Sequence, residues 1–245
     1  MEPRTKIFFA SDVHLGLRTS DPAEREDRFV RWLKSVPRDA TKALYLLGDI
    51  WDFWYEYRDV IPREGIRVIA QLIDLVDAGV EVYFVPGNHD IWCYSFFEQI
   101  GIRKCEQPIE FEFGGKVFCA GHGDRLGGAD RSYLLLQKIF HCKFLQALFS
   151  ALHPWIAFRF GLGWSCSNRR GHVPYSFRGA EEPLYKWADE RLSCGRVDYF
   201  IFGHFHDGVD MEMREGSRLI VLDDWMSGDM PHVEFDAAEG SVAVF

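Results

Sequence analysis

"KIFFASDVHLG", residues 6–16, joins an apolar run of strand length to a polar loop that contains Asp12 and His14. The aromatic and β-branched residues of the run predict a buried strand. An apolar run followed by a loop rich in Gly, Asp, Asn and His returns four more times, after residues 43–47, 80–85, 116–120 and 197–202. We therefore expect five strands whose following loops carry the chemistry.

Helical patterns separate the early runs. Asp21 and Pro22 have the residue types of an N-cap and a first helical position ahead of "AEREDRFVRWLKSV", and "GIRVIAQLIDLVDAG" closes on Gly79. Alternating strands and helices predict an α/β layered fold with a mostly parallel sheet at its centre. After about residue 205 the short alternating runs "DMEMR", "RLIVLDD", "HVEF" and "SVAVF" predict antiparallel strands.

The composition excludes several classes of protein. The formal charge of −9 argues against a broad nucleic-acid-binding face, so no nucleic-acid partner is expected. The six cysteines contain no CxxC pair, which predicts reduced thiols. No leader-like apolar segment is evident at the N-terminus, and no run approaches the roughly 20 residues of a spanning helix, so a cytoplasmic protein is expected.

Residues 131–180 differ from the rest of the chain, because they include seven Lys and Arg residues and no Asp or Glu. Within them "YLLLQKIFHCKFLQALFSALH", residues 133–153, places its polar residues close to helical spacing and apolar residues around most of the remaining circumference. We expect a basic, apolar helical cap at residues 125–180, inserted into a catalytic domain made of residues 1–124 and 181–245.

The five polar loops are expected to meet, because the carboxyl ends of the strands of an open α/β sheet form the edge where ligands bind. Their metal-binding side chains are Asp12, His14, Asp49, Asn88, His122, His204 and His206. Carboxylate, amide and imidazole donors without a thiolate suit divalent ions at open sites and suit a structural zinc poorly. Seven donors exceed the needs of one ion, so we expect two, with Asp49 as the natural bridge.

The ordered motifs D-x-H (12–14), G-D (48–49), G-N-H-D (87–90), H-G-D (122–124) and G-H-x-H (203–206) resemble those of the calcineurin-like metallophosphoesterase superfamily. The resemblance spans residues 7 to about 207 and implies a four-layer αββα sandwich. It implies one ion on Asp12, His14, Asp49 and His206, and a second on Asp49, Asn88, His122 and His204. Mn²⁺ is the expected metal.

The resemblance also implies hydrolysis of a phosphoester, since a pair of divalent ions can activate water and neutralise phosphate oxygens. His89 is then the expected catalytic group, which stabilises the transition state or protonates the leaving oxygen, and Asp90 is expected to orient it. The alternative for His89 is a residue that only steadies the loop.

The substrate must be inferred from the cap, because the superfamily acts on phosphoproteins, nucleotides and pyrophosphates alike. An apolar and basic surface complements a lipid that is also an anion. "GDIWDFW", with Leu126, Asp130 and Tyr133 after H-G-D, makes the chain similar to bacterial UDP-2,3-diacylglucosamine pyrophosphatases of lipid A biosynthesis. That similarity implies release of UMP and 2,3-diacylglucosamine 1-phosphate, with the acyl chains held by the cap.

The similarity implies that Asp130 and Tyr133 contact the sugar or phosphate. Further candidates for the polar head are Ser167, Asn168, Arg169 and Arg170. The narrower family has Arg and Cys where this chain has His89 and Gly127. Another nucleotide or lipid-linked diphosphate, a phosphoprotein, or a metal-free scaffold role therefore stays open.

The cap also predicts a membrane partner. Its apolar residues Trp155, Phe158, Phe160 and Trp164 could enter an anionic leaflet, which would place the protein on the cytoplasmic face of the inner membrane. The alternative is a cap folded wholly onto the catalytic domain.

Overall fold

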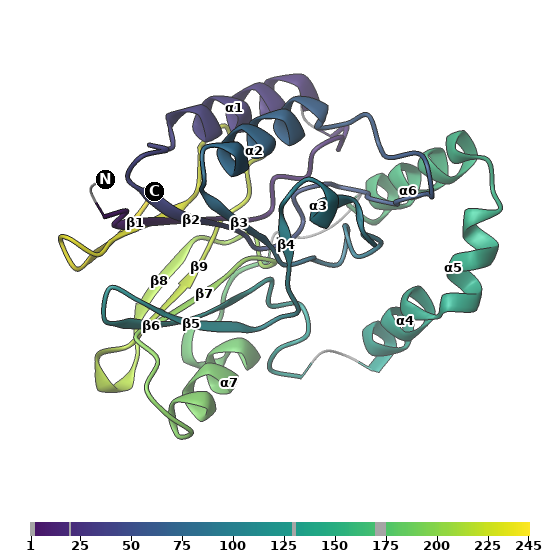
Figure 1. Ribbon diagram of the computed structural model, residues 1–245. Helices are drawn as coiled ribbons and strands as arrows, with labels where there is room; N and C mark the ends of the chain where they lie inside the picture. The colour runs from purple at the N-terminus through teal and green to yellow at the C-terminus, as the bar shows by residue number, and fades with distance from the viewer. Residues whose placement is uncertain (1–2, 20, 129–130, 170–174) are drawn as a thin grey trace.

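Two β-sheets packed face to face form the centre of the molecule (Figure 1). The computed structural model describes residues 3–19, 21–128, 131–169 and 175–245. The first sheet has the order β11 (Ser241–Val244), β10 (Val233–Asp236), β1 (Lys6–Ala10), β2 (Thr41–Leu46), β3 (Glu81–Phe84) and β4 (Arg103–Lys104). The second has the order β5 (Ile109–Phe113), β6 (Lys116–Gly121), β7 (Tyr199–Phe202), β9 (Arg218–Val221) and β8 (Val209–Glu212).

Each sheet has a parallel centre, which confirms the α/β prediction. β1 to β4 run parallel in the first sheet, and β6, β7 and β9 run parallel in the second. The antiparallel prediction for the back of the chain is confirmed for β8, β10 and β11. It is also confirmed for "RLIVLDD" on one side only: β9 pairs antiparallel with the edge strand β8, and on its other side it lies parallel to β7.

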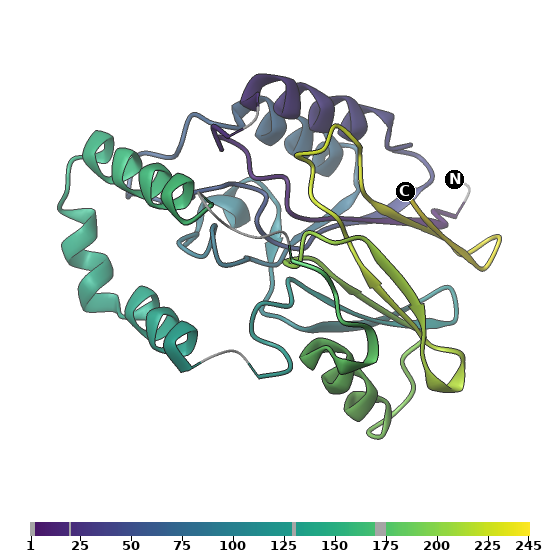
Figure 2. The same ribbon diagram turned by 180° about the vertical axis from the view of Figure 1, so that it is seen from behind.

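Helices cover the outer faces of both sheets (Figures 1 and 2). α1 (Pro22–Ser35) and α2 (Ile66–Asp77) pack on the first sheet, and the Asp21 carboxylate caps α1 by accepting from the backbone N–H of Ala23 and Glu24. α7 (Pro183–Leu192) packs on the second sheet through Leu184 and Ala188. Three short helices, α3 (Phe96–Gln99), η1 (Gly179–Glu181) and η2 (Arg214–Gly216), lie in the connections.

Aromatic side chains fill the space between the sheets. Tyr45 of the first sheet stacks on Phe111 of the second at a ring distance of 4.5 Å, and Phe9 lies 5.9 Å from Phe118. Such pairs add to the free energy gained by burying the rings. Because this core holds the two sheets together, the loops after β1, β2 and β3 face the loops after β6, β7 and β9.

Three helices form an arm beside the two sheets (Figures 1 and 2). They are α4 (Arg131–His141), α5 (Lys143–Ser150) and α6 (Pro154–Arg169). The helical pattern of residues 133–153 is interrupted at Cys142, which has extended backbone (φ −70°, ψ 109°). The Phe140 carbonyl there accepts from the side chains of Trp92 (3.0 Å) and Gln146 (2.7 Å), which favours the end of α4 at this point.

The arm rests on the loop that follows β2. The Phe53 ring lies 6.0 Å from the ring of Phe158, and the Tyr55 hydroxyl donates to the Gln146 carbonyl at 2.8 Å. The boundaries of the predicted insertion, 125 and 180, stay a prediction, and residues 129–130 and 170–174 lie outside the described residues. Among the described helices none is long and apolar enough to cross a membrane. All six cysteines are free thiols.

Candidate metal centre

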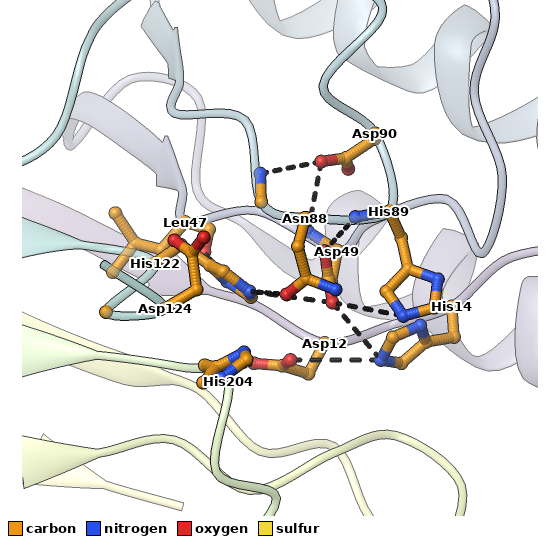
Figure 3. Close-up of polar contacts among 12 residues, drawn as sticks. Asp12, His14, Leu47, Asp49, Asn88, His89, Asp90, His122, Asp124 and His204 are labelled. Carbon is orange, nitrogen blue, oxygen red and sulfur yellow. Dashed lines mark hydrogen bonds and ion pairs between the residues drawn. The ribbon is translucent and has the colours of Figure 1, made fainter. Parts of the chain in front are cut away.

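The predicted metal ligands meet at one edge of the two sheets (Figure 3). Asp12 and His14 follow β1, Asp49 follows β2, and Asn88 follows β3. His122, His204 and His206 come from the other sheet, after β6 and β7. Each sheet therefore supplies part of the cluster.

The backbone at these positions is unusual. Six described non-glycine residues have a positive φ, and five of them are the predicted ligands Asp12, His14, Asp49, His204 and His206, with φ between 49° and 74°. A left-handed backbone is unfavourable for residues with a Cβ and persists where the surroundings impose it. Its concentration at one edge indicates a functional site.

Two glycines let the backbone approach the carboxylates. A Cβ at Gly203 would lie 2.2 Å from Asp12 Oδ2, and one at Gly87 would lie 2.2 Å from Asp49 Oδ1. Without a Cβ there, each carboxylate can approach the backbone and form a hydrogen bond. Asp12 Oδ2 accepts from the backbone N–H of His204, and Asp49 Oδ1 accepts from the backbone N–H of His89, both at 2.9 Å. One oxygen of each carboxylate is thus held by backbone.

The first group of donors consists of Asp12, His14 and His206. His206 Nε2 lies 3.2 Å from His14 Nε2 and 3.3 Å from Asp12 Oδ1. Asp12 Oδ1 is buried and meets the geometry of a hydrogen bond with no described residue. An oxygen in that position is placed to bind a cation.

The second group consists of Asp49, Asn88, His122 and His204. His122 Nε2 lies 3.1 Å from Asn88 Oδ1 and 3.5 Å from Asp49 Oδ2, and its ring is 5.0 Å from that of His204. Asp49 Oδ2 is also 3.9 Å from His14 Nε2 of the first group. Asp49 is therefore placed between the two groups, as a bridging carboxylate must be.

Carboxylates and carbonyls orient the imidazoles from behind. The Leu47 carbonyl lies 3.0 Å from His122 Nδ1, the Asp224 carboxylate 2.9 Å from His206 Nδ1, and Asp52 Oδ1 3.4 Å from His14 Nδ1. Such partners fix the tautomer and direction of a ligating imidazole. The sequence analysis did not identify Asp52 or Asp224 as site residues. Asp224 could have been found from its position after the apolar run "RLIVL", had β9 been expected to lie parallel to β7 as well as antiparallel to β8.

His89 and Asp90 occupy different environments. His89 Nδ1 faces the Asp52 carbonyl at 2.8 Å, and its Nε2 lies 3.9 Å from Asp49 Oδ2. The expectation that Asp90 orients His89 is wrong. Asp90 is fully buried, and its oxygens accept from the backbone N–H groups of Gly87, Asp49, Ile50 and Trp51. Asp90 therefore fastens the loop after β3 to the loop after β2.

The charges of the cluster shift the pKa of its histidines. Burial lowers the pKa of His206, but its contacts with Asp12 and Asp224 outweigh this and raise it to about 10. His122 behaves similarly, with burial opposed by the charges of Asp49 and Asp12, which raise its pKa to about 9. Burial opposed by the contact with His206 leaves the pKa of Asp12 below its ordinary value. In the absence of metal, protons thus supply the positive charge that the carboxylates require.

The donors fit a pair of divalent ions. Two imidazole nitrogens that share one ion at about 2.0–2.1 Å lie about 2.8 to 3.4 Å apart at octahedral to tetrahedral angles, and the His14 to His206 distance of 3.2 Å falls in this range. Each of three overlapping groups, Asp12/His14/His206, His14/Asp49/His89 and Asp12/Asp49/His122, places its donor atoms within 4.8 Å of one another. The structure therefore contains a candidate dimetal site.

The structure describes the side chains of only some of the residues predicted to bind substrate. The Tyr133 hydroxyl donates to Asp124 at 2.7 Å and accepts from Gln137 at 2.7 Å, which ties α4 to the loop after β6. Ser167 is exposed on α6. Asn168 and Arg169 belong to the end of the same helix, Asp130 and Arg170 lie outside the described residues, and the side chains of Asn168 and Arg169 are likewise not described.

Comparisons with known proteins agree with this geometry. Residues 5–208 match the family model of the calcineurin-like phosphoesterases. A UDP-2,3-diacylglucosamine hydrolase of Porphyromonas gingivalis is 35% identical over 240 residues, which cover 91% of each chain. Proteins of the same name from Hamiltonella defensa and Klebsiella pneumoniae are 29% and 28% identical and cover 95% of this chain and 93% and 96% of their own. The chain therefore belongs to the calcineurin-like phosphoesterase family.

Proposed function

We propose that the protein hydrolyses the pyrophosphate bond of UDP-2,3-diacylglucosamine, releasing UMP and 2,3-diacylglucosamine 1-phosphate in lipid A biosynthesis. The observation that carries the proposal is a candidate dimetal site beside an arm that is both apolar and basic. The names of the relatives support the same substrate.

The arm has the surface chemistry of a lipid-binding element. Its exposed side chains include Leu135, Phe144, Trp155 and Phe160, each at least 57% exposed. Exposed apolar patches mark sites where a protein binds a lipid, an apolar ligand or another protein. The arm therefore exposes large apolar side chains that another apolar surface could cover.

A cavity of about 920 Å³ between α6 and the loop before α2 combines apolar and basic groups. Phe158, Leu162 and Ile61 supply apolar walls, and the arginines that line it are Arg18, Arg63 and Arg159. The cavity begins beside the loop of His14, since a Cβ at Gly16 would lie 3.0 Å from Glu64 and 3.9 Å from Leu162, both of which line it. An acyl chain next to a phosphate matches this lining.

The chain's own residues supply binding, orientation and proton transfer. The two groups of donors would hold two divalent ions, Mn²⁺ in our proposal, which when bound activate water and neutralise phosphate oxygens. Asp49 fixes the spacing of the two groups. His89 is held by the Asp52 carbonyl at Nδ1, which leaves Nε2 directed to the site to donate to the leaving oxygen when the ring is protonated.

The arm is also proposed to attach the protein to the cytoplasmic face of the inner membrane. Trp155, Phe160 and Trp164 are exposed on α6, and Arg159 lies between them in sequence. Apolar and cationic groups on one helix favour anionic bilayers. In a vesicle flotation assay the protein should float with anionic vesicles, and Trp155→Ser should reduce the bound fraction. If the wild-type protein does not bind anionic vesicles, the proposed membrane attachment is wrong.

The decisive experiment compares three substrates with manganese-loaded protein. UDP-2,3-diacylglucosamine, the non-acylated UDP-sugar and bis-p-nitrophenyl phosphate are incubated in parallel, with Asn88→Ala as the control. UMP is followed by mass spectrometry for the two UDP compounds, and p-nitrophenol by its absorbance for the diester. We expect acyl-dependent UMP release that the control lacks. Cleavage of the small diester alone would keep the phosphoesterase chemistry and redirect the substrate search to other nucleotide or lipid-linked diphosphates and phosphoproteins. A protein that binds no metal would point to a scaffold.

A further inference from the structure

One residue of the arm reaches the candidate metal centre from behind. The Ser165 hydroxyl on α6 donates to Asp52 Oδ1 at 2.8 Å. Both side chains are inaccessible, with Ser165 3% exposed and Asp52 1% exposed. Ser165 belongs to none of the family motifs and lies 113 positions from its partner. The contact therefore joins the arm to the loop that carries Asp49.

Asp52 contacts two histidines of the site. The carboxylate oxygen that accepts from Ser165 lies 3.4 Å from His14 Nδ1, and the Asp52 carbonyl accepts from His89 Nδ1 at 2.8 Å. On the opposite side of its ring, His14 Nε2 faces His206. A shift of the Asp52 carboxylate would thus turn the His14 imidazole, which belongs to the first group of donors.

The seating of α6 determines where Ser165 lies. Ala157, Gly161 and Ser165 recur at intervals of four residues and are buried, whereas Trp155, Phe160 and Trp164 are exposed. A Cβ at Gly161 would lie 2.4 Å from the Phe53 ring, so α6 packs against Phe53 and Asp52 with one face. Movement of α6 would disturb the packing and the Ser165 hydrogen bond together.

We propose that Ser165 is a positioning residue that couples the seating of the helical arm to the geometry of the metal centre through Asp52. A carboxylate behind a ligating imidazole sets its orientation and basicity. The Ser165 hydroxyl holds that carboxylate in place. A ligand that displaces α6 therefore alters metal binding without touching a metal ligand. The inference rests on the metal centre of the proposed function and not on the identity of its substrate.

The test measures Mn²⁺ binding by the full chain, read from the electron paramagnetic resonance signal of free Mn²⁺. Ser165→Ala should weaken binding at one of the two sites at least about threefold, somewhat less than the roughly 10- to 100-fold typical of a direct partner of a ligand. Ser165→Thr keeps the hydroxyl and should restore affinity. Ser150→Ala is the matched control, because that hydroxyl donates to the Ala147 carbonyl within its own helix.

A double-mutant cycle with Asp52→Asn identifies the route. If Ser165 acts through Asp52, adding Ser165→Ala to Asp52→Asn should change affinity little, whereas independent effects would add. Gly161→Ala should shift α6 without removing a hydroxyl, and it should also weaken Mn²⁺ binding. This variant replaces Ser165→Ala in the test if Ser165→Ala fails to fold. Wild-type Mn²⁺ affinity in folded Ser165→Ala, or additive effects in the cycle, would overturn the proposal. These measurements need no substrate, so their outcome does not depend on whether the proposed substrate is correct.

Discussion

His14 Nε2 and His206 Nε2 lie 3.2 Å apart, although the two residues are 192 positions apart in the chain and come from different sheets. Two neutral imidazole nitrogens at this distance can share only one proton, and two protonated rings would repel each other. Behind them, Asp52 and Asp224 occupy the Nδ1 sides. A cation held by both rings would stabilise the arrangement, and the predictions below begin from it.

His206→Ala should abolish catalysis. It removes a donor from the first group, the imidazole nitrogen that lies 3.3 Å from Asp12 Oδ1. We expect at least a roughly 100-fold loss of phosphodiesterase rate, since even partners of ligands are typically worth 10- to 100-fold. His153→Ala, which removes an exposed imidazole of the arm, should leave the rate unchanged. Equal rates in both variants would exclude His206 from the metal centre.

His89→Ala should separate catalysis from metal binding. His89 contacts Asp49 only at 3.9 Å and is held from behind by Asp52. Loss of a general acid typically costs about 10²- to 10⁴-fold in rate. We expect that loss in kcat together with near wild-type Mn²⁺ stoichiometry, measured by metal analysis after gel filtration. Loss of one ion per chain would instead make His89 a ligand.

Asp90→Asn should lower stability. The carboxylate accepts hydrogen bonds from four backbone N–H groups, and a neutral amide would direct its own N–H₂ at some of them. Burial and the charge of Asp49 raise the pKa of Asp90 to about 7. Hydrogen bonds to a charged group are worth roughly 1.5–3 kcal/mol, so we expect a loss of about that size in urea unfolding at a pH above 7. An Asp90→Asn variant with wild-type stability and no activity would restore a catalytic role.

Gly203→Ala should disrupt the first group of donors. The new methyl would lie 2.2 Å from Asp12 Oδ2 and must displace that carboxylate. We expect Mn²⁺ affinity to fall at least about tenfold, as for other changes that misplace a ligand. Gly163→Ala is the control, because a Cβ there meets nothing within 4 Å. Titration calorimetry of both variants would distinguish a local clash from a general effect of added side chains.

Metal should stabilise the protein more as pH rises. In the metal-free fold the pKa of His206 is raised to about 10 and that of His122 to about 9. Protonation of these rings therefore stabilises the metal-free fold fully below pH 6.5, and this contribution is lost as pH rises toward 9 and 10. Metal requires the deprotonated rings. The Tm difference between manganese-loaded and chelated protein should thus widen from pH 6.5 to 8.5; a constant or shrinking difference would contradict the assignment.

Most of the metal-binding donors could be predicted from the sequence. Each follows an apolar run of strand length, and the carboxyl ends of parallel strands meet at one edge of a sheet. Asp12, Asn88 and His122 could be predicted in this way. Asp224 was missed because the strand before it was expected only among antiparallel neighbours, whereas β9 also lies parallel to β7, a pairing that the local pattern does not reveal. Ser165 had no sequence signal at all, since its contact depends on how α6 packs against a loop over a hundred residues away. The break at Cys142 likewise depends on Trp92, a distant residue.

The division of the donors between two sheets would give bound metal ions a mechanical role in the fold. Asp12, His14, Asp49 and Asn88 belong to one sheet, and His122, His204 and His206 belong to the other. Elsewhere the sheets are joined by packed apolar side chains, among them stacked aromatic rings. Ions bound at this edge would cross-link the sandwich at one end and make its halves unfold as one cooperative unit. Chelation would then release amide hydrogens of both sheets to exchange together, beginning at the strand ends that carry the ligands.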